Sequence, residues 1–154
     1  MVTNEVSRLA TLRACQILDT PPEKAFDDLV RLAAMICGTP MGVISFVDED
    51  RLWLKAVVGS LERSLPRRAS FCDQAIHSAA LSIVADAARD ARFAGHPLVT
   101  LGVRFYAGAP LVVGPRCAIG TLAVLAPETR ELNAQQREAP VSYTHLTLPT
   151  ILRV

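Results

Sequence analysis

The sequence predicts an α+β domain in which an antiparallel sheet carries helices packed on it. An apolar stripe at helical spacing runs to residue 37, and two adjoining extended segments at 41–58 have the pattern of a hairpin. Two long apolar segments, 103–113 and 117–125, then follow each other across a Gly-Pro turn. Helices first, then paired strands joined by short connections, indicate this fold class.

Two helices are expected before the first strand. Residues 4–16 form a short helix that breaks before a second one begins. We expect Thr20 to be the N-cap of this second helix, because Pro21 suits a first helical turn and Glu23 occupies the capping-box position. Gly38 ends the helix. Its apolar side chains recur at steps of three and four residues: Phe26, Leu29, Val30, Ala33, Ile36 and Cys37.

Two strands and a short helix are expected next. Residues 41–47 and 52–58 pair across an acidic turn. A loop rich in serine, arginine and proline, 59–69, leads to Ser70, whose hydroxyl can cap a short helix with Asp73 at the capping-box position.

The later part of the chain is expected to complete the sheet. Residues 82–85 form a short strand, and a polar loop with one helical turn continues to His96. Apolar residues alternate strictly from Val103 to Val113, which places one apolar row on a sheet face. The last strand covers 117–125.

The sequence changes character after Ala139. Residues 128–139 are rich in helix formers, and Pro140 is expected to stop that helix. The string VSYTHLTLPT (141–150) matches one reading frame of a transposase adapter used in sequencing libraries.

We therefore expect one domain over 1–139 and a non-native sequencing-adapter translation over 140–154. The alternative is a genuine C-terminal edge strand, because Tyr143, Thr144 and Thr147 favour extended backbone.

Composition excludes several function classes. The chain holds 16 Lys and Arg against 15 Asp and Glu, a formal net charge of +1. A balanced charge without a basic block gives no electrostatic case for binding nucleic acid or an anionic membrane. No segment approaches the roughly 18 continuous apolar residues of a membrane-spanning helix, and the first residues lack the pattern of a signal peptide. We expect a cytoplasmic protein.

The four cysteines show no pattern of a metal site, and no metal is expected. Cys15, Cys37 and Cys117 lie among apolar neighbours, where a free cysteine acts as a small hydrophobe. Cys72 lies in the first turn of the helix capped by Ser70, so it is the candidate for thiol chemistry. The absence of CxxC pairs favours a reducing compartment.

Five phrases in fixed order carry a family resemblance. They are ILDTPPE (17–23), SFCDQAI (70–76), VADAARDARFA (84–94), VRFYAGAPL (103–111) and IGTLAV (119–124). Together they resemble the GAF domain of bacterial sensor and signalling proteins, in the subgroup often found ahead of histidine kinases and diguanylate cyclases.

The resemblance implies a GAF-like (PAS-like) sheet whose crossing segments enclose a small-molecule pocket. It also implies flanking helices, here 4–16 and the one from about 128, that pair across a homodimer and pass a signal to an effector outside this chain. The chain itself is then regulatory rather than an enzyme, with no catalytic residue, and no motif identifies a cofactor. The candidate ligand-binding residues are Trp53, Ser70, Phe71, Cys72, Asp86 and Tyr106.

Two other functions stay open. A ligand-free dimerisation module predicts a filled apolar interior between the sheet and residues 59–100, whereas an open pocket with convergent polar groups favours sensing. A thiol-dependent reductase that resembles the free methionine sulfoxide reductases would use Cys72.

Several of these side chains also have purely structural interpretations. Arg67 and Arg68 either meet an anion at the helix N-terminus or lie solvated in their loop. Asp86, Asp90 and Arg92 suit local salt bridges and turn caps, and Trp53 and Tyr106 suit core or rim packing. His77 and His96 are expected to be bystanders, with His96 in a surface loop.

Overall fold

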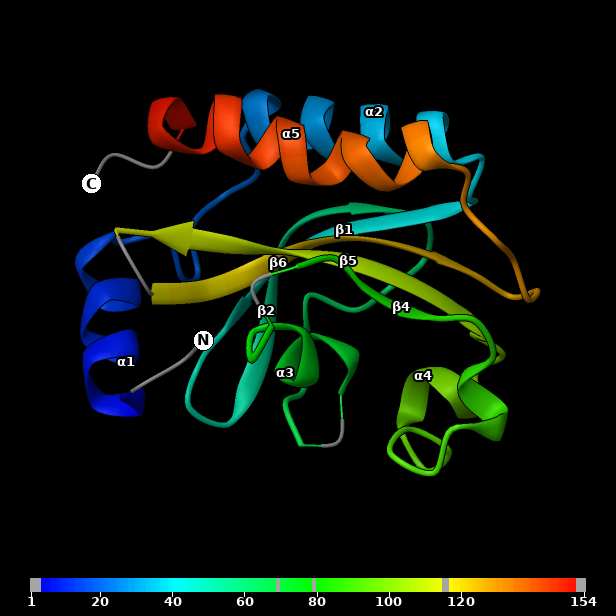
Figure 1. Cartoon of the computed structure of the whole chain (residues 1–154). Helices are drawn as coiled ribbons and strands as arrows, with labels where there is room; N and C mark the ends of the chain where they lie inside the picture. Colours follow the sequence, from blue (N-terminus) through cyan, green and yellow to red (C-terminus); the bar gives the residue numbers. More distant parts are fainter. Residues whose placement is uncertain (1–3, 69, 79, 115–116, 152–154) are drawn as a thin grey trace.

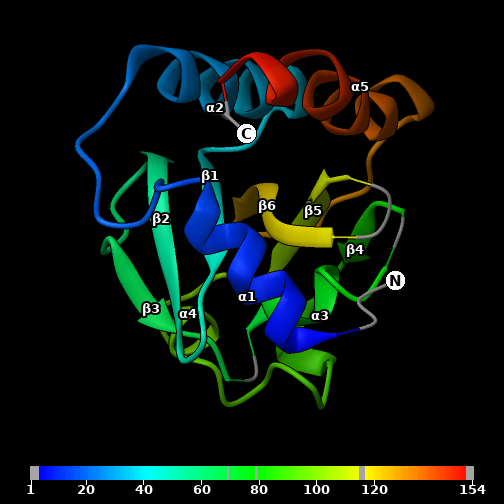
Figure 2. The same cartoon turned by 90° about the vertical axis from the view of Figure 1, so that its left-hand side faces the viewer.

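The computed structural model describes residues 4–68, 70–78, 80–114 and 117–151, the last stretch from 143 onward by its backbone. Within this part, six antiparallel strands form one sheet in the order β3-β2-β1-β6-β5-β4. Figure 1 shows the sheet as a middle layer, with α2 and α5 side by side on one face and α3 and α4 on the other. Helix α1 lies across one end of the sheet (Figure 2). The predicted α+β class and antiparallel sheet are confirmed.

The helices are α1 (Glu5–Ala14), α2 (Lys24–Cys37), α3 (Phe71–Ala75), α4 (Pro97–Thr100) and α5 (Ala134–Ile151), with a 3-10 turn at Ala87–Arg89. The strands are β1 (Met41–Val47), β2 (Arg51–Val58), β3 (Ser64–Pro66), β4 (Ser82–Val84), β5 (Phe105–Val113) and β6 (Cys117–Ala126). Strand β3 lies inside the segment 59–69, which is expected to be a loop, and the 3-10 turn gives the loop before His96 its expected helical turn. Helix α4 follows that loop and is not predicted.

The sheet separates two apolar cores. The upper core, beneath α1, α2 and α5, includes Leu12, Phe26, Phe46, Phe105 and Leu122. The lower core, against α3 and α4, includes Val43, Leu54, Phe71, Ile76 and Ala123. The predicted alternation along β5 is therefore correct but incomplete, because Phe105 and Ala107 face the upper core while Tyr106 faces the lower one. Val103, which precedes the strand, belongs to the lower core.

Helix α2 begins at Lys24 rather than at the predicted Pro21. Glu23 is its N-cap and makes no side-chain capping bond. Thr20 has another role, because its hydroxyl donates to the carbonyl of Ile17 at 2.6 Å and accepts from Lys55. The αL residue Gly38 ends the helix as predicted.

Lys55 is a fully buried lysine that ties β2 to the segment before α2. A register irregularity in the β1–β2 pairing skips this residue. Its ammonium group donates to the carbonyl of Pro21 and pairs with the carboxylate of Glu23, each at 2.6 Å. It also lies 5.2 Å from the centre of the Phe26 ring. A charge at this depth is tolerated because these contacts replace its water shell.

Helix α5 continues through Pro140, so both the predicted stop and the alternative of an edge strand are wrong. Pro140 has no N–H to donate to the carbonyl of Gln136, and the thiol of Cys37 donates to that carbonyl instead at 3.8 Å. The helix begins with a reciprocal capping box between Asn133 and Gln136 that the sequence analysis missed. Residues 152–154 lie outside the described residues, and the expected domain end at Ala139 stays a prediction.

We predict that Lys55→Met lowers the free energy of unfolding by about 2 kcal/mol, because the Pro21 carbonyl and the Thr20 hydroxyl lose their donor. The measurement is urea denaturation at neutral pH. Lys24→Met is the matched control, because this lysine is 88% exposed in its ion pair with Asp28 and should change stability by less than about 0.5 kcal/mol. Equal losses in the two variants would contradict a structural role of the buried ammonium group.

Candidate functional site

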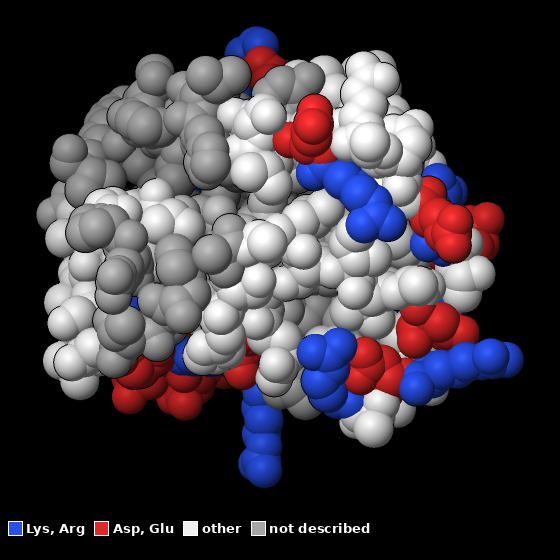
Figure 3. Space-filling model, in the orientation of Figure 1, with Lys and Arg blue, Asp and Glu red and all other residues white. Residues whose placement is uncertain are grey.

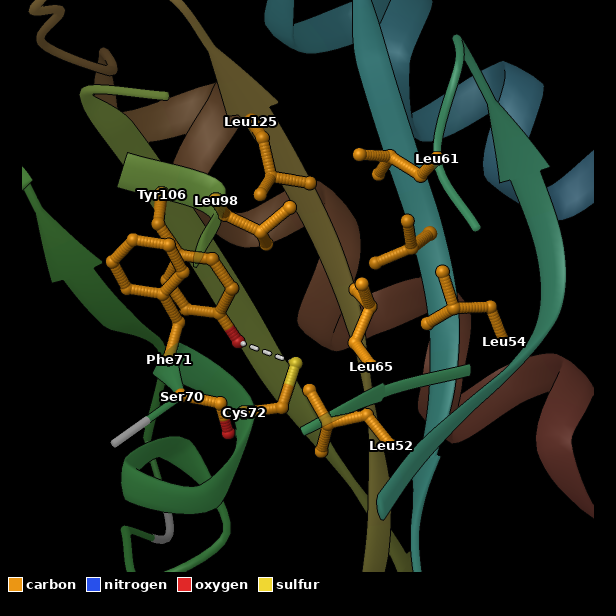
Figure 4. Close-up of a pocket in the computed structure, with 11 residues that line it drawn as sticks. Leu52, Leu54, Leu61, Leu65, Ser70, Phe71, Cys72, Leu98, Tyr106 and Leu125 are labelled. Carbon is orange, nitrogen blue, oxygen red and sulfur yellow. Dashed lines mark hydrogen bonds between the residues drawn. The ribbon is translucent and has the colours of Figure 1, made fainter. Parts of the chain in front are cut away.

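An inner cavity lies in the lower core, between the sheet and α3 (Figure 4). Its volume is about 10 Å³, the room for roughly one water molecule. It is lined by Val43, Leu52, Leu54, Leu61, Leu65, Ser70, Phe71, Cys72, Leu98, Tyr106 and Leu125. The deepest part of the lower core is therefore nearly filled, mostly by leucine side chains.

A larger outer cleft lies beside α3 and the edge strand β4. Its volume is about 250 Å³. It is lined by Phe71, Gln74, His77, Ser78, Ser82, Ile83, Val84, Arg92, Phe93 and Tyr106. In contrast to the inner cavity, half of these side chains are polar, and they come from α3, the turn after it, β4 and the loop before α4.

Three aromatic rings lie between the inner cavity and the outer cleft. They belong to Phe71, Phe93 and Tyr106, and we call them the aromatic wall. Phe71 and Tyr106 line both spaces. Their rings are stacked, with centroids 4.8 Å apart and an interplanar angle of 18°. Phe93 lies 4.7 Å from Phe71 between ring centroids. The wall gives the outer cleft a flat apolar floor and closes the inner cavity from that side.

The N-cap of α3 places Phe71 and Cys72 against the sheet. The hydroxyl of Ser70 accepts from the backbone N–H of Asp73 at 3.0 Å, as the sequence predicted. The carboxylate of Asp73 does not close a capping box, because it accepts from the guanidinium of Arg67 at 2.8 Å. A short helix held at both its cap and its first turn presents the two side chains in fixed positions.

Arg67 links this helix to α1. Its guanidinium pairs with Glu5 at 2.6 Å and also donates to the carbonyl of Asp48. The almost fully buried Arg8 holds the same Glu5 carboxylate at 2.8 Å. The donors of Arg67 are used inside the protein and its side chain is only 15% exposed, so neither the anion-binding nor the solvated interpretation holds.

These two guanidinium groups change the acidity of Glu5. Hydrogen bonds from Arg8, and then from Arg67, lower the pKa of Glu5 to about 2, against the opposing effect of partial burial. The carboxylate therefore stays ionised through the acidic range in the folded protein.

Cys72 lies in a polar cluster where the lower core meets the sheet. The hydroxyls of Ser45 and Thr121 each lie 3.1 Å from its sulfur and 3.1 Å from each other. The phenol of Tyr106 donates to the same sulfur at 3.6 Å (Figure 4). Burial, and then the neighbouring Cys72, raise the pKa of Tyr106 well above its usual range, so the phenol stays protonated.

Gly108 makes room for the Tyr106 side chain. The two residues share one face of β5, and a Cβ atom at position 108 would overlap the Tyr106 hydroxyl. The AG pair in the phrase RFYAGAPL therefore has a physical explanation, because the glycine lets the phenol reach Cys72.

The structure brings together four of the six predicted site residues. Ser70, Phe71, Cys72 and Tyr106 all line the inner cavity. Trp53 lies in the upper core, across the sheet from both spaces, because β2 alternates its side chains. Asp86 lines neither of these two spaces. Its carboxylate caps the 3-10 turn by accepting from the N–H of Ala88, as its structural interpretation predicted.

Sequence reasoning missed the polar side of the outer cleft, above all Gln74, His77 and Ser82. Gln74 lies near the end of the short α3 and His77 in the turn after it, and two polar residues this close to a capped helix were a usable signal. His96 was also misplaced, since it is only 1% exposed and its Nδ1 accepts from the N–H of Leu98 as the N-cap of α4. Burial lowers the pKa of His96, against a weak contact with the carbonyl of Pro66.

All four cysteines are free. Cys15 and Cys37 belong to the upper core and Cys117 packs against it, so the sheet separates all three from Cys72. Across the described ranges, no three His, Cys, Asp or Glu side chains are grouped to hold a metal ion. None of the helices described is both long and apolar enough to cross a membrane.

Charges are mixed on the surface. Figure 3 shows basic and acidic side chains next to one another on this face, without a large block of one sign among its coloured atoms. The ion pairs of the described structure include Arg51 with Asp19 and Arg92 with Asp90, each at 2.7 Å. This agrees with the expectation from composition that the charged surface is balanced.

The fold and the cavities define a class of protein. It is a small α+β domain in which two long helices cover one face of the sheet, while the inner cavity and the outer cleft lie on the other face. The chain belongs to the GAF domain family, whose profile matches residues 21–140. It is 36% identical over 129 residues to a cyclic di-GMP phosphodiesterase of Pseudomonas aeruginosa, a match that covers 82% of this chain and 22% of that relative. The chain thus spans about a fifth of this relative.

Solved structures agree on the fold. The GAF domain of an Acinetobacter phosphoenolpyruvate-protein phosphotransferase has a TM-score of 0.64 at 18% identity, covering 94% of this chain and 91% of that one. Free methionine-R-sulfoxide reductase from Neisseria meningitidis, solved with its substrate, has a TM-score of 0.65 at 14% identity, covering 95% and 89%. At these identities the likeness confirms the GAF fold alone.

We predict that Gly108→Ala lowers the free energy of unfolding by about 1–3 kcal/mol, because the added methyl group displaces the Tyr106 ring. Urea denaturation measures the loss. Gly95→Ala is the matched control, since nothing lies within 4 Å of a Cβ atom there and its φ is not in the left-handed region. A loss for Gly108→Ala no larger than that for Gly95→Ala would show that the close contact with Tyr106 is not limiting.

We predict a pH-dependent contribution from Glu5. Its folded pKa, about 2, lies below the ordinary value of 4.5, so its stabilisation is fully present above that value and is lost as the pH falls toward 2. The side chain is 42% exposed, so we expect Glu5→Gln to cost about 1 kcal/mol at pH 7.

The measurement is urea denaturation of both proteins at pH 7, 4 and 3, where the difference should shrink with pH. Glu62→Gln, at an exposed position without an ion pair to any residue the structure describes, serves as the control. A difference that stays constant from pH 7 to pH 3 would be inconsistent with the Arg8–Glu5–Arg67 linkage.

Proposed function

We propose that this chain is a sensory GAF module of a bacterial signalling protein and that it binds a small molecule in the outer cleft. The observation that carries the proposal is a cleft of about 250 Å³ in which polar side chains converge over an aromatic floor. Such a lining, apolar with a few placed polar groups, is typical of small-molecule sites. The inner cavity is too small for this role as it stands.

The contacts of α3 supply a route from the cleft to a flanking helix. A ligand in the outer cleft would touch Phe71, the first residue of α3. Asp73 on the same helix is held by Arg67, and Arg67 holds Glu5 of α1. A ligand that favours one position of α3 would thereby favour one arrangement of α1, provided that its affinity differs between the two.

We place the effector outside this chain. The Pseudomonas relative is a cyclic di-GMP phosphodiesterase, and the chain matches only 22% of it. This supports an effector that acts on cyclic di-GMP, such as a phosphodiesterase or the expected diguanylate cyclase, more than it supports a histidine kinase. Free cysteines suit a reducing compartment, and we accordingly propose a cytoplasmic location.

The thiol-reductase alternative receives less support. Cys72 shares its side of the sheet with no other cysteine among the four, so a disulfide partner within the fold would have to cross the sheet. A disulfide needs Cα atoms within about 7 Å.

A ligand-free dimerisation module is the second candidate. Two observations favour it, the nearly filled inner cavity and the exposed apolar side chains of Leu32 and Met35 on α2, which are 37% and 69% exposed. Three residues apart on one helix, they lie close together on its surface and suit a second copy of the chain.

We predict that a library of small metabolites contains compounds that shift the amide NMR signals of Gln74, His77 and Ser82 in the ¹⁵N-labelled protein. Signals of upper-core residues such as Ala33 should stay unchanged. Ser82→Phe, which fills the cleft from β4, should abolish the shifts, whereas Ser64→Phe on the opposite edge strand should retain them. If no compound shifts a cleft signal while sedimentation shows a dimer, the ligand-free module is the correct function.

A further inference from the structure

The outer cleft is rich in hydrogen-bond donors and contains no carboxylate. Its polar lining consists of Gln74, His77, Ser78, Ser82 and Arg92. Each can donate a hydrogen bond, and the guanidinium can only donate. Neither Asp nor Glu is among the residues that line this cleft, and the nearby carboxylate of Asp90 is already paired with Arg92.

We propose that the outer cleft binds a small anion that carries an aromatic or comparably flat apolar group. Arg92 and His77 hold the anionic group, and the aromatic wall holds the ring. This inference rests on the proposed function and adds the chemical class of the ligand.

Arg92 is oriented before any ligand arrives. Its Nε and Nη2 donate to the carboxylate of Asp90 at 3.0 and 2.7 Å, and its guanidinium lies 4.8 Å from the centre of the Phe93 ring. Within the described part of the chain, its Nη1 has no acceptor. A planar cation fixed on one side, with N–H groups left over, suits a carboxylate or phosphate oxygen at little entropic cost.

The opposite side of the cleft has unused donors too. In the part of the molecule that the structure describes, neither the Gln74 amide nor the His77 ring makes a side-chain hydrogen bond. Gln74 lies on α3 and His77 in the turn that follows it, and both side chains are exposed. An oxygen-rich group between α3 and Arg92 would therefore gain hydrogen bonds without displacing any internal ones.

The aromatic wall determines which chemical group suits the rest of the ligand. Phe71, Phe93 and Tyr106 give the cleft its apolar floor, and Val84 of β4 extends it, whereas the side chain of Ile83 packs against the upper core. A flat ring would stack on this floor in the offset or tilted geometries that aromatic groups prefer. The volume of about 250 Å³ limits the ligand to metabolite size, below the roughly 300 Å³ of the smallest sites for drug-sized molecules.

Three probes with one ring and different charges test the inference. Phenylacetate, 2-phenylethanol and phenethylamine are titrated separately into the ¹⁵N-labelled protein, and the shifts of the Gln74, His77 and Ser82 signals give each affinity. We expect phenylacetate to bind about tenfold more tightly than either other probe, because only it offers a charged acceptor to Arg92.

Two matched variants test whether the preference for phenylacetate depends on Arg92. Arg92→Gln should reduce the affinity for phenylacetate to that for 2-phenylethanol. Arg89→Gln should leave it unchanged, because Arg89 is likewise exposed and paired with an aspartate but does not line the cleft. His77→Gln should weaken binding as well, and it decides the question if Arg92→Gln fails to fold.

The outcomes separate the two levels of the proposal. If 2-phenylethanol or phenethylamine shifts the cleft signals at lower concentration than phenylacetate, the anionic class is wrong while a binding cleft remains. If phenylacetate binds best but neither Arg92→Gln nor His77→Gln weakens it, the assigned residues are wrong. If neither these probes nor the metabolite library shifts any cleft signal, the proposed function fails and the inference with it.

Discussion

The burial of the sheet on both faces is the constraint on which the rest of the structure depends. Strands β1, β6 and β5 lie in the middle of the sheet, with apolar cores above and below them. Any polar group on these strands must therefore find its partner inside the protein. Ser45 and Thr121 do so with each other and with Cys72 of α3. The polar side chains of the outer cleft come instead from α3, the turn after it, β4 and the loop before α4.

The two cores differ in how they are packed. The upper core is closed by specific polar contacts at its rim, where Lys55 holds the segment before α2 and Gln136 joins α5 to α2. The lower core is less uniformly packed and contains both the inner cavity and the aromatic wall. In the proposed sensory role, a change in the lower core on binding would reach the flanking helices through the contacts of α3.

Local patterns in the sequence predicted what depends on neighbouring residues, such as the apolar stripe of α2 and the Ser70 cap. They failed where a distant residue decides. Thr20 lies in a sequence typical of an N-cap, but its hydroxyl accepts a hydrogen bond from Lys55, 35 positions away. Pro140 has the sequence of a helix stop, but Cys37 replaces the missing donor. The outer cleft escaped prediction for the same reason, since α3, β4 and Arg92 meet only in the folded chain.

The two edges of the sheet have a consequence for assembly. Strands β3 and β4 are three residues each, and β3 ends at Pro66, whose nitrogen has no hydrogen to offer a neighbouring strand. Edges this short give an incoming extended chain few backbone groups to pair with, which protects a sheet against uncontrolled growth into larger aggregates. The proposed second copy of this domain would therefore dock on the helical layer, where a contact can form and separate without rebuilding the sheet.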